Sequence, residues 1–277
     1  MSAGPDLARY FARIGYDGSP RPTLETLRAL HAAHAAAIPF ENLAAFLGEP
    51  VSLELEAIQD KLLTPGRGGW CFEHNMLFSH VLDAIGFRVM RLAARVRWNV
   101  PQGVITPRSH MLLRVTLDEE YIADVGFGGL TLTAPLALDV DGEQATPHEP
   151  HRLLRQGAAY MLQAKLGGEW QDLYLFEVQG QLPVDYEAAN WFLATHPRSQ
   201  FVRGIVAARA APGARHALRN TRYTMHVPGK PPQRRFVTSL PELRALLAGE
   251  FQVQVPTGDE ADRRLGRMIE ENPPTWE

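Results

Sequence analysis

The stretch Arg67-Gly68-Gly69-Trp70-Cys71-Phe72-Glu73-His74-Asn75 divides the chain into two parts of different character. It follows the breaker cluster Thr64-Pro65-Gly66, and from Cys71 onward apolar residues recur at helical spacing as far as Ile85. Gly86 stands where a helix cap is expected. The sequence therefore predicts a tight glycine turn, then a helix with Cys71 at its N-terminus.

Upstream of this turn the sequence is alanine-rich and helical in character from Thr23 to about Ala45. Downstream, from Phe87, short runs of β-branched and aromatic residues alternate with turn residues. The expected strands are 87–98, 110–117, 121–125, 160–166, 170–178, 223–227 and 235–238, and a further helix is expected at about 241–248. This pattern indicates an α+β fold with a helical first lobe, a second lobe that is a β-sheet or barrel, and a mixed tail.

Composition narrows the class of protein. A chain of 277 residues, 45% of them hydrophobic, can bury a proper core. Its single cysteine excludes an intramolecular disulfide and any multi-cysteine metal site, which fits a reducing compartment. No stretch approaches the roughly 20 apolar residues that span a bilayer, so we expect a cytoplasmic protein without a membrane partner.

The net charge of −3 conceals an uneven distribution along the chain. Residues 188–241 contain eight Arg and one Lys but no Asp or Glu. Such a segment can present a positive surface to the phosphates of CoA, a nucleotide or a nucleic acid, or it can be an ordinary solvated face. Both interpretations stay open at this point.

A lone cysteine is more often a small buried hydrophobe than a nucleophile. The glycine turn before Cys71 leaves the thiol uncovered, and the positive end of the following helix favours the thiolate form. These features make the two interpretations about equal. A cysteine nucleophile also needs a histidine to take its proton and a third group to orient that histidine.

The chain offers ten histidines for this role. His31 and His34 lie one turn apart on an early helix, and we expect packing or surface roles for both. His74 is three residues after Cys71, but a rigid helix gives its ring little freedom to face the sulfur. His110 opens an expected strand, and Asp124 ends the next one between two apolar residues, where a carboxylate is costly without a partner.

The spacing leaves open how His110 and Asp124 would meet. A hairpin turning on 118–120 pairs Leu117 with Tyr121 and Asp124 with Arg114, as a cross-strand ion pair. His110 then lies about 13 Å away along the strand. Direct opposition of His110 and Asp124 requires a turn centred on Leu117 or a β-bulge. From spacing alone, the ion pair is favoured.

The stretch from Arg67 to Asn75 resembles the signature of the arylamine N-acetyltransferases. Further segments resemble the family in the same order along residues 10–205, while the last 70 or so are similar in general character only. No insertion separates the second and third lobes, which is typical of bacterial members. The further segments are Ile38–Leu43, Ser109–Met111 and Asp124–Gly129, with Asn190, Thr195, Pro197, Ser199 and Phe201.

The resemblance implies a cysteine-protease-like core with a catalytic triad of Cys71, His110 and Asp124, and therefore the shifted turn or the bulge. It implies a helical lobe over 1–86 carrying the cysteine, a β-barrel over 87–205 carrying the other two residues, and an α/β lid over 206–277. It also implies acetyl-CoA as co-substrate and aromatic amines, hydrazines or N-hydroxyarylamines as acceptors. The reaction would follow ping-pong kinetics, need no metal and serve xenobiotic metabolism. The protein would be a monomer or a homodimer.

The acceptor pocket is expected at Phe127, Gly128 and Gly129, with Phe40 as a further wall or an ordinary core residue. Glu41 and Glu73 are expected in structural ion pairs, with Arg67 as a partner.

Three other functions compete with acetyl transfer. The same triad could serve an amide synthase of aromatic polyketide biosynthesis or a cysteine hydrolase. A nucleic-acid-binding module with an inert Cys71 is the non-enzyme alternative, but its basic segment lacks interleaved aromatic platforms, so we expect no nucleic-acid partner.

Overall fold

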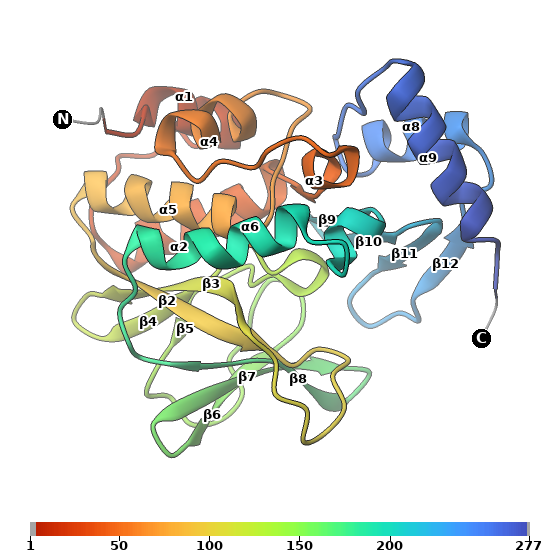
Figure 1. Cartoon of the computed structure of the whole chain (residues 1–277). Coiled ribbons are helices and arrows are strands. Elements are labelled where there is room, and N and C mark those ends of the chain that lie inside the picture. Colours follow the sequence, from red (N-terminus) through yellow and green to blue (C-terminus); the bar gives the residue numbers. More distant parts are fainter. Residues whose placement is uncertain (1–3, 276–277) are drawn as a thin grey trace.

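The computed structural model describes residues 4–275 and shows a helical layer lying against a barrel-like sheet, with a second sheet beside both (Figure 1). This is the α+β architecture that the sequence predicts. The helices are α1 (Leu7–Ile14), α2 (Leu24–Ala37), α3 (Leu43–Leu47), α4 (Leu55–Leu62), α5 (Cys71–Ile85), α6 (Glu187–Thr195), α7 (Gln200–Arg203), α8 (Leu240–Gly249) and α9 (Asp259–Glu271), with 3₁₀ turns η1 (Gly128–Leu130) and η2 (Pro183–Tyr186). The strands are β1 (Phe40–Glu41), β2 (Arg88–Val96), β3 (Arg108–Thr116), β4 (Glu120–Ala123), β5 (Leu136–Ala137), β6 (His151–Gln156), β7 (Ala159–Leu166), β8 (Glu169–Glu177), β9 (Val206–Ala211), β10 (Ala214–Arg219), β11 (Arg222–His226) and β12 (Gln233–Phe236).

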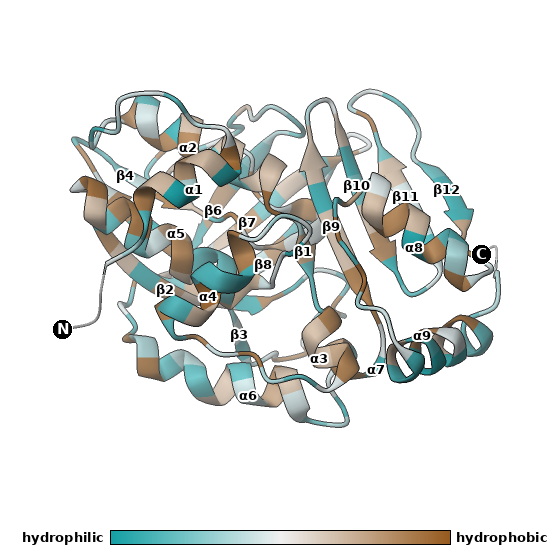
Figure 2. Cartoon of the chain, turned by 90° about the horizontal axis from the view of Figure 1, so that it is seen from above, coloured by the Kyte–Doolittle hydropathy of each residue, from teal (hydrophilic) through white to brown (hydrophobic). Residues whose placement is uncertain are grey.

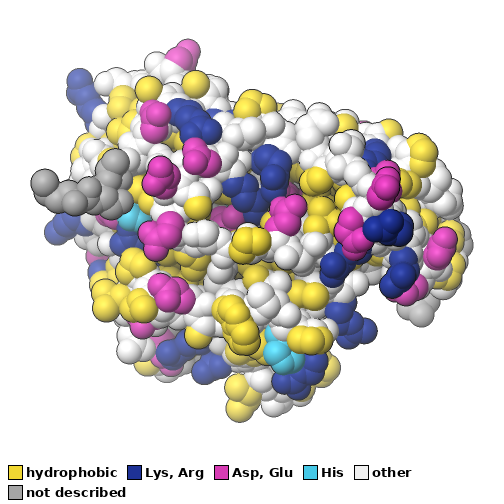
Figure 3. All heavy atoms as spheres, turned by 45° about the horizontal axis from the view of Figure 1, so that its top comes forward, with side chains coloured by type: hydrophobic (Ala, Val, Ile, Leu, Met, Phe, Trp, Pro, Cys, Tyr) yellow, Lys and Arg dark blue, Asp and Glu magenta, His cyan; other side chains and the backbone are white. Residues whose placement is uncertain are grey.

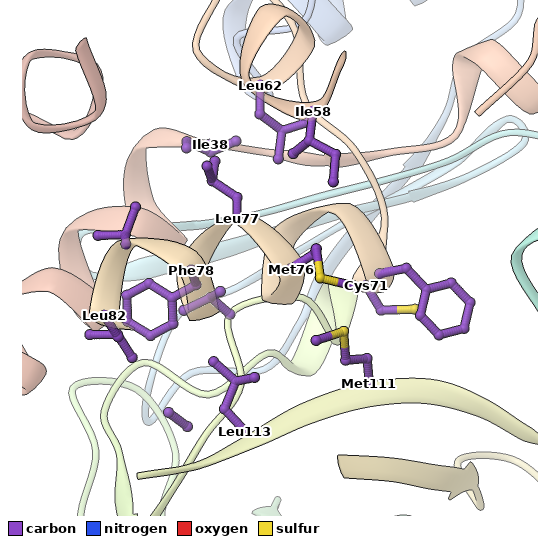
Figure 4. Packing of buried hydrophobic residues seen from close by; sticks show 14 of the residues in the cluster. Ile38, Ile58, Leu62, Cys71, Met76, Leu77, Phe78, Leu82, Met111 and Leu113 are labelled. Atoms are coloured by element: carbon purple, nitrogen blue, oxygen red, sulfur yellow. The ribbon is translucent and has the colours of Figure 1, made fainter. Parts of the chain in front are cut away.

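Helix α5 begins at Cys71, as predicted, and ends at Ile85, where it is capped by Gly86, whose φ of 102° is a conformation that favours glycine. The helix is buried on nearly all sides, which explains why its apolar residues are not confined to one face. Figure 4 shows Leu77 pointing toward Ile38 on one side of the helix, while Met111 and Leu113 of β3 lie on the other. The nucleophile candidate therefore sits on an element whose position is fixed by packing.

The helical stretch predicted from Thr23 to about Ala45 is interrupted. Helix α2 ends at Ala37, Ile38 is extended, and a separate short helix α3 follows the strand β1. Pro39 explains the break, because a proline disfavours helical backbone at the residue before it and cannot donate a backbone hydrogen bond. The extended segment that results pairs with β9, Phe40 opposite Ala208.

Within residues 4–275, seven antiparallel strands form the barrel-like sheet, in the order β5-β4-β3-β2-β8-β7-β6. Gln144 links the two edge strands. Its side-chain amide exchanges two hydrogen bonds of 2.8 Å with the backbone of Ala137 in β5, while its own backbone pairs with His151 in β6. Strand β6 and helix α6 were not predicted, although both lie in the 87–205 segment.

The β3–β4 hairpin has a register that the sequence did not predict. Leu113 faces Ala123, and Val115 faces Tyr121, so the turn centres on Asp118. This is half of the shift that direct opposition of His110 and Asp124 would need, and no bulge interrupts this pair of strands within the described residues. The favoured Arg114–Asp124 ion pair is wrong, because Arg114 binds Glu120 instead, with Nε 3.1 Å from Oε2.

The second sheet has the order β1-β9-β10-β11-β12, and α8 and α9 pack against it around a separate apolar cluster. Strands β9 and β10 were not predicted, since their alanine-rich sequences carry little β-propensity. Figure 2 shows α9 with a broad hydrophilic face turned outward. No helix in the described part of the chain is long and apolar enough to span a bilayer.

Candidate active site

The turn before Cys71 requires glycine because other groups approach its backbone closely. A Cβ on Gly68 would lie 2.0 Å from the carbonyl oxygen of Pro39, and one on Gly69 would lie 2.6 Å from Oε2 of Glu73. The same Glu73 oxygen accepts a hydrogen bond from the Trp70 backbone N–H at 3.1 Å. These contacts fix Cys71 as the first residue of α5, with its thiol 3.8 Å from the carbonyl oxygen of Ser109.

His110 and Asp124 form a buried pair beside this thiol. His110 Nε2 lies 2.7 Å from Asp124 Oδ2, and the two side chains are 3% and 0% exposed. Burial opposes a charge on His110, but the negative charge and hydrogen bond of Asp124, helped by a hydrogen bond with Cys71, raise its pKa to about 10. Since Nε2 is occupied by Asp124, a hydrogen bond between the ring and the thiol can involve only Nδ1.

The pair forms despite the register because β4 ends at Ala123, so Asp124 has left the strand. Extending the register would place Asp124 opposite Leu112, two residues from His110. A diagonal separation of two residues is within reach of long and aromatic side chains.

Asp124 is held at every polar atom. Its Oδ1 accepts hydrogen bonds of 2.9 Å from Asn75 Nδ2 and from the Gly126 N–H. Burial alone would raise its pKa, but the His110 charge and these hydrogen bonds lower it below its usual value. Its backbone N–H donates to His31 Nε2 at 3.1 Å, and its carbonyl accepts from the Thr131 hydroxyl.

Asn75 was not singled out by sequence reasoning, although it lies in the quoted stretch. It donates to the Met111 carbonyl at 2.7 Å as well as to Asp124, and it accepts from the Val125 N–H. The available signal was its position four residues after Cys71, which places both on one face of α5. Asn75 thus ties the helix of the thiol to the loop of the carboxylate.

Aromatic rings enclose the imidazole. Phe127 packs edge-on to His110 with ring centres 5.0 Å apart, and Tyr174 of β8 lies 4.9 Å from His110. The Tyr174 side chain is buried, and burial together with the charge of Asp124 raises its pKa well above the usual range. It is therefore a neutral phenol. Tyr174 falls in a predicted strand, but nothing in its local sequence marks it as part of a site.

The glycine loop after Asp124 lies between Phe40 and β10. A Cβ on Gly128 would lie 3.7 Å from the Phe40 ring, and one on Gly129 would lie 3.6 Å from Ala217. Phe40 is 9% exposed and belongs to the main core cluster, while Phe127 is only half-buried. The structure thus brings the four expected pocket residues together and places one of them, Phe127, against His110.

A later segment of the chain contacts the turn before Cys71 through Trp70. The indole N–H donates to Asn190 Oδ1 of α6 at 3.1 Å, and the ring packs against Phe201 at 5.4 Å between centres. Phe201 also contacts Phe40.

The two buried glutamates near the turn have different partners. Glu41 lies 3.6 Å from Arg67, as expected, but Glu73 binds Lys61 with both carboxylate oxygens, at 2.8 and 3.0 Å.

The basic segment is partly neutralised. Arg215 binds Glu149, Arg235 binds Glu242, and Arg209 donates to two backbone carbonyls. Within residues 4–275, the other cations of this segment are exposed and form no ion pair; they are Arg198, Arg203, Arg219, Arg222, Lys230 and Arg234. Figure 3 shows basic and acidic side chains interspersed on the face in view. No group of three or more metal-ligating side chains occurs among the described residues.

Known proteins share this sequence and this fold. A family model described as N-acetyltransferase matches residues 23–260. The arylamine N-acetyltransferase of Mycolicibacterium smegmatis is 41% identical over 271 residues, which are 96% of this chain and 98% of that protein. The Escherichia coli K12 arylamine N-acetyltransferase is 40% identical over 253 residues, 91% and 90% of the two chains.

Solved structures of arylamine N-acetyltransferases have the same fold as this chain. An arylamine N-acetyltransferase of M. smegmatis superposes with a TM-score of 0.91 at 39% identity, over 96% of this chain and 99% of that one. The Mycobacterium marinum arylamine N-acetyltransferase in complex with CoA gives 0.90 at 40% identity, over the same shares. The similarity in sequence and in structure therefore extends into the C-terminal segment, where only a general resemblance was expected. On these grounds the chain belongs to the arylamine N-acetyltransferase family.

Proposed function

We propose that this protein transfers an acetyl group from acetyl-CoA to aromatic amines, hydrazines or N-hydroxyarylamines, with Cys71 as the nucleophile and an acetyl-cysteine as the intermediate. The observation that carries the proposal is the placement of Cys71 at the start of α5 beside His110, whose Nε2 lies 2.7 Å from Asp124. Family membership and the CoA complex of the M. marinum relative support the donor.

In the first half-reaction, Nδ1 of His110 holds the thiol proton while Sγ of Cys71 attacks the thioester carbonyl carbon. The tetrahedral intermediate collapses with cleavage of the bond to the CoA sulfur, and His110 delivers its proton to that leaving thiolate. The backbone N–H groups of the first turn of α5 lack partners within the helix and can stabilise the oxyanion. Asp124 holds the ring and stabilises its protonated form.

In the second half-reaction, the amine nitrogen attacks the acetyl carbonyl carbon and the carbon–sulfur bond breaks. His110 takes the proton that the nitrogen loses, and the sulfur is restored with His110 as its partner. CoA leaves before the amine reacts, so the kinetics are ping-pong.

Phe127 is proposed as the aromatic wall of the acceptor site, because it is half-buried and packs against His110. Gly128 and Gly129 let a flat ring approach the backbone, and Phe40 closes the site from the helical side. The six unpaired cations of the basic segment are proposed to attract the CoA phosphates.

The test is to incubate the protein with acetyl-CoA alone, digest it, and search by mass spectrometry for acetyl on the peptide containing Cys71. Acetyl on that peptide, absent from Cys71→Ala, is expected, and adding an arylamine should then release it as the acetylated amine. An unlabelled wild-type peptide, or equal transfer by Cys71→Ala, would overturn the proposal. Rapid loss of the label in water without an amine would favour the hydrolase instead.

A further inference from the structure

Helix α2 carries two histidines that face the candidate site from behind. His31 and His34 are both fully buried, so of the two expected roles, packing and surface, only packing applies. Each makes a hydrogen bond toward a different part of the site. The Phe78 ring packs between them, with centres 5.9 Å from His31 and 5.5 Å from His34, and Figure 4 shows Phe78 projecting from α5.

His31 binds the backbone of the carboxylate residue. The Asp124 N–H donates to His31 Nε2 at 3.1 Å, so this nitrogen is an acceptor and the ring proton resides on Nδ1. Burial lowers the pKa of His31 to about 4, which keeps the ring neutral near pH 7. A proton on Nε2 would face the Asp124 N–H and abolish the contact. His31 therefore holds Asp124 only in one protonation state and one tautomer.

His34 acts on the other side of the site through His74. His74 Nε2 lies 3.1 Å from the Pro39 carbonyl oxygen, which can only accept, so Nε2 carries the proton. Nδ1 of His74 then accepts from Nε2–H of His34 at 2.9 Å, and Nδ1 of His34 accepts from the Tyr10 hydroxyl at 3.0 Å. Because the Pro39 carbonyl oxygen can only accept, it determines which ring nitrogen carries the proton in both His74 and His34. His74 is thus turned away from the thiol that its sequence position suggested it might serve.

This series of hydrogen bonds ends at the turn before Cys71. The Pro39 carbonyl also accepts from the Gly69 N–H at 3.3 Å, and the Glu41 N–H donates to the Gly69 carbonyl at 2.9 Å. Gly69 is two residues before Cys71. One helix is therefore hydrogen-bonded to Asp124 through His31 and, by way of His34 and His74, to the residue that fixes the Cys71 turn.

We propose that His31 and the His34–His74 pair are positioning residues that set the spacing between the Asp124 carboxylate and the Cys71 thiol. None of them touches a reacting atom. The proposal rests on the proposed role of Cys71 and His110, but its tests follow protons and thiol reactivity rather than acetyl transfer. A failure here and a failure of the proposed function are therefore distinguishable.

The first test uses the unaltered protein. Long-range ¹H–¹⁵N correlation spectra of ¹⁵N-histidine-labelled protein at pH 7 should show that the rings of His31, His34 and His74 are neutral. The proton is expected on Nδ1 of His31 and on Nε2 of both His34 and His74. Assignment comes from the loss of one ring's signals in each single His→Gln variant. The opposite tautomer at His31 or at His74 would overturn the proposal.

The second test compares His31→Leu with His31→Gln. Leucine leaves the Asp124 N–H unpaired, whereas a glutamine oxygen can still accept from it. We expect His31→Leu to slow alkylation of Cys71 by iodoacetamide about tenfold to a hundredfold near pH 7 and to shift its pH profile. His31→Gln should recover most of the rate.

The matched control is His216→Phe in β10. His216 is also buried, its Nδ1 lies 2.7 Å from the Tyr223 hydroxyl, and its ring packs against Phe251 of the second apolar cluster. This variant should lower the melting temperature without changing the alkylation profile. A folded His31→Leu protein with the wild-type rate and profile would refute the positioning role. Should that variant fail to fold, the tautomers of the unaltered protein decide.

Discussion

The side-chain amide of Asn75 donates to Oδ1 of Asp124 at 2.9 Å, while Oδ2 of the same carboxylate pairs with His110. The carboxylate is thus held both from α5, the helix that also carries Cys71, and from His110 of β3. Helix α5 therefore carries Cys71, binds Asp124 through Asn75, and is linked to His110 through Asp124.

Replacing Asp124 by asparagine should reduce the rate of Cys71 acetylation by about 10³–10⁴-fold, because the neutral amide cannot stabilise protonated His110. Rapid-quench mass spectrometry of a single turnover with acetyl-CoA measures this rate. Asp172→Asn is the matched control, since Asp172 is an exposed carboxylate on β8 that accepts from Gln163. Glu73→Gln should fall well short of the Asp124→Asn effect. An Asp124→Asn protein within tenfold of wild type would contradict the triad.

Replacing Gly126 by alanine should impair the site through contact alone. The added Cβ would lie 2.8 Å from Cα of Cys71 and 3.0 Å from Nδ2 of Asn75, so one of these segments must move. We expect a drop of roughly a hundredfold in acetylation rate, since a displacement of about 1 Å can cost that much. Gly266→Ala in α9 meets no atom within 4 Å and should behave as wild type. Equal rates for the two variants would show that the close packing at Gly126 is unimportant.

The acid stability of the protein should reflect its buried neutral histidines. Burial lowers the pKa of His151 to about 4, against about 6.5 in an unfolded chain. Between these pH values the unfolded state binds a proton at His151 and the folded state does not. The free energy of unfolding therefore falls as the pH drops from about 6.5 to about 4. For one such group the full loss is on the order of 3 kcal/mol.

His151→Leu removes this group at little cost in hydrogen bonding, because Nε2 lies 3.5 Å from Glu149 Oε1 and neither ring nitrogen makes a hydrogen bond within the described residues. Its urea-unfolding free energy should depend less steeply on pH between 7 and 4 than that of the wild type. His110 behaves oppositely. Its pKa of about 10 contributes stability that is complete below about pH 6.5 and is lost as the pH rises through 10. An unchanged acid slope in His151→Leu would contradict the first expectation.

Phe127→Leu should raise the KM for an arylamine several-fold while leaving Cys71 acetylation by acetyl-CoA within a few-fold of wild type, because the ring is proposed to contact the acceptor and not the donor. Steady-state kinetics with the amine varied, set beside single-turnover acetylation, separate the two effects. The reverse pattern, with slow acetylation and an unchanged KM, would assign Phe127 to the support of His110 that its 5.0 Å ring contact also allows.

Local sequence was sufficient for the features that local physics determines. The glycines before Cys71, the helix after it and its cap at Gly86 depend on residues close together in the chain. Strand β8 carries three aromatic residues, Trp170, Tyr174 and Phe176, which made it predictable, and an apolar setting rightly marked Asp124 as needing a partner.

Most of the features that were missed depend on partners far away in sequence. The Asp124–His31 contact spans 93 residues and the His34–His74 contact spans 40, and no spacing rule connects such pairs. The hairpin register was wrong because turn composition alone does not determine how tightly residues 117–119 close. Tyr174 and Asn75 acquire their roles only through the three-dimensional arrangement.

The pairing of strand β1 with β9 links the reactivity of Cys71 to the order in which the chain is synthesised. Phe40 and Glu41 form the edge of a sheet whose next strand, β9, begins at Val206, and the Val206 N–H binds Asn42 across 164 residues. A ribosome releases the Cys71 helix long before it makes β9. Strand β1, which pairs with Gly69 in the turn before Cys71, therefore has no β9 partner until three quarters of the chain has emerged. We expect stalled nascent chains that end before β9 to carry a Cys71 that is present but unactivated.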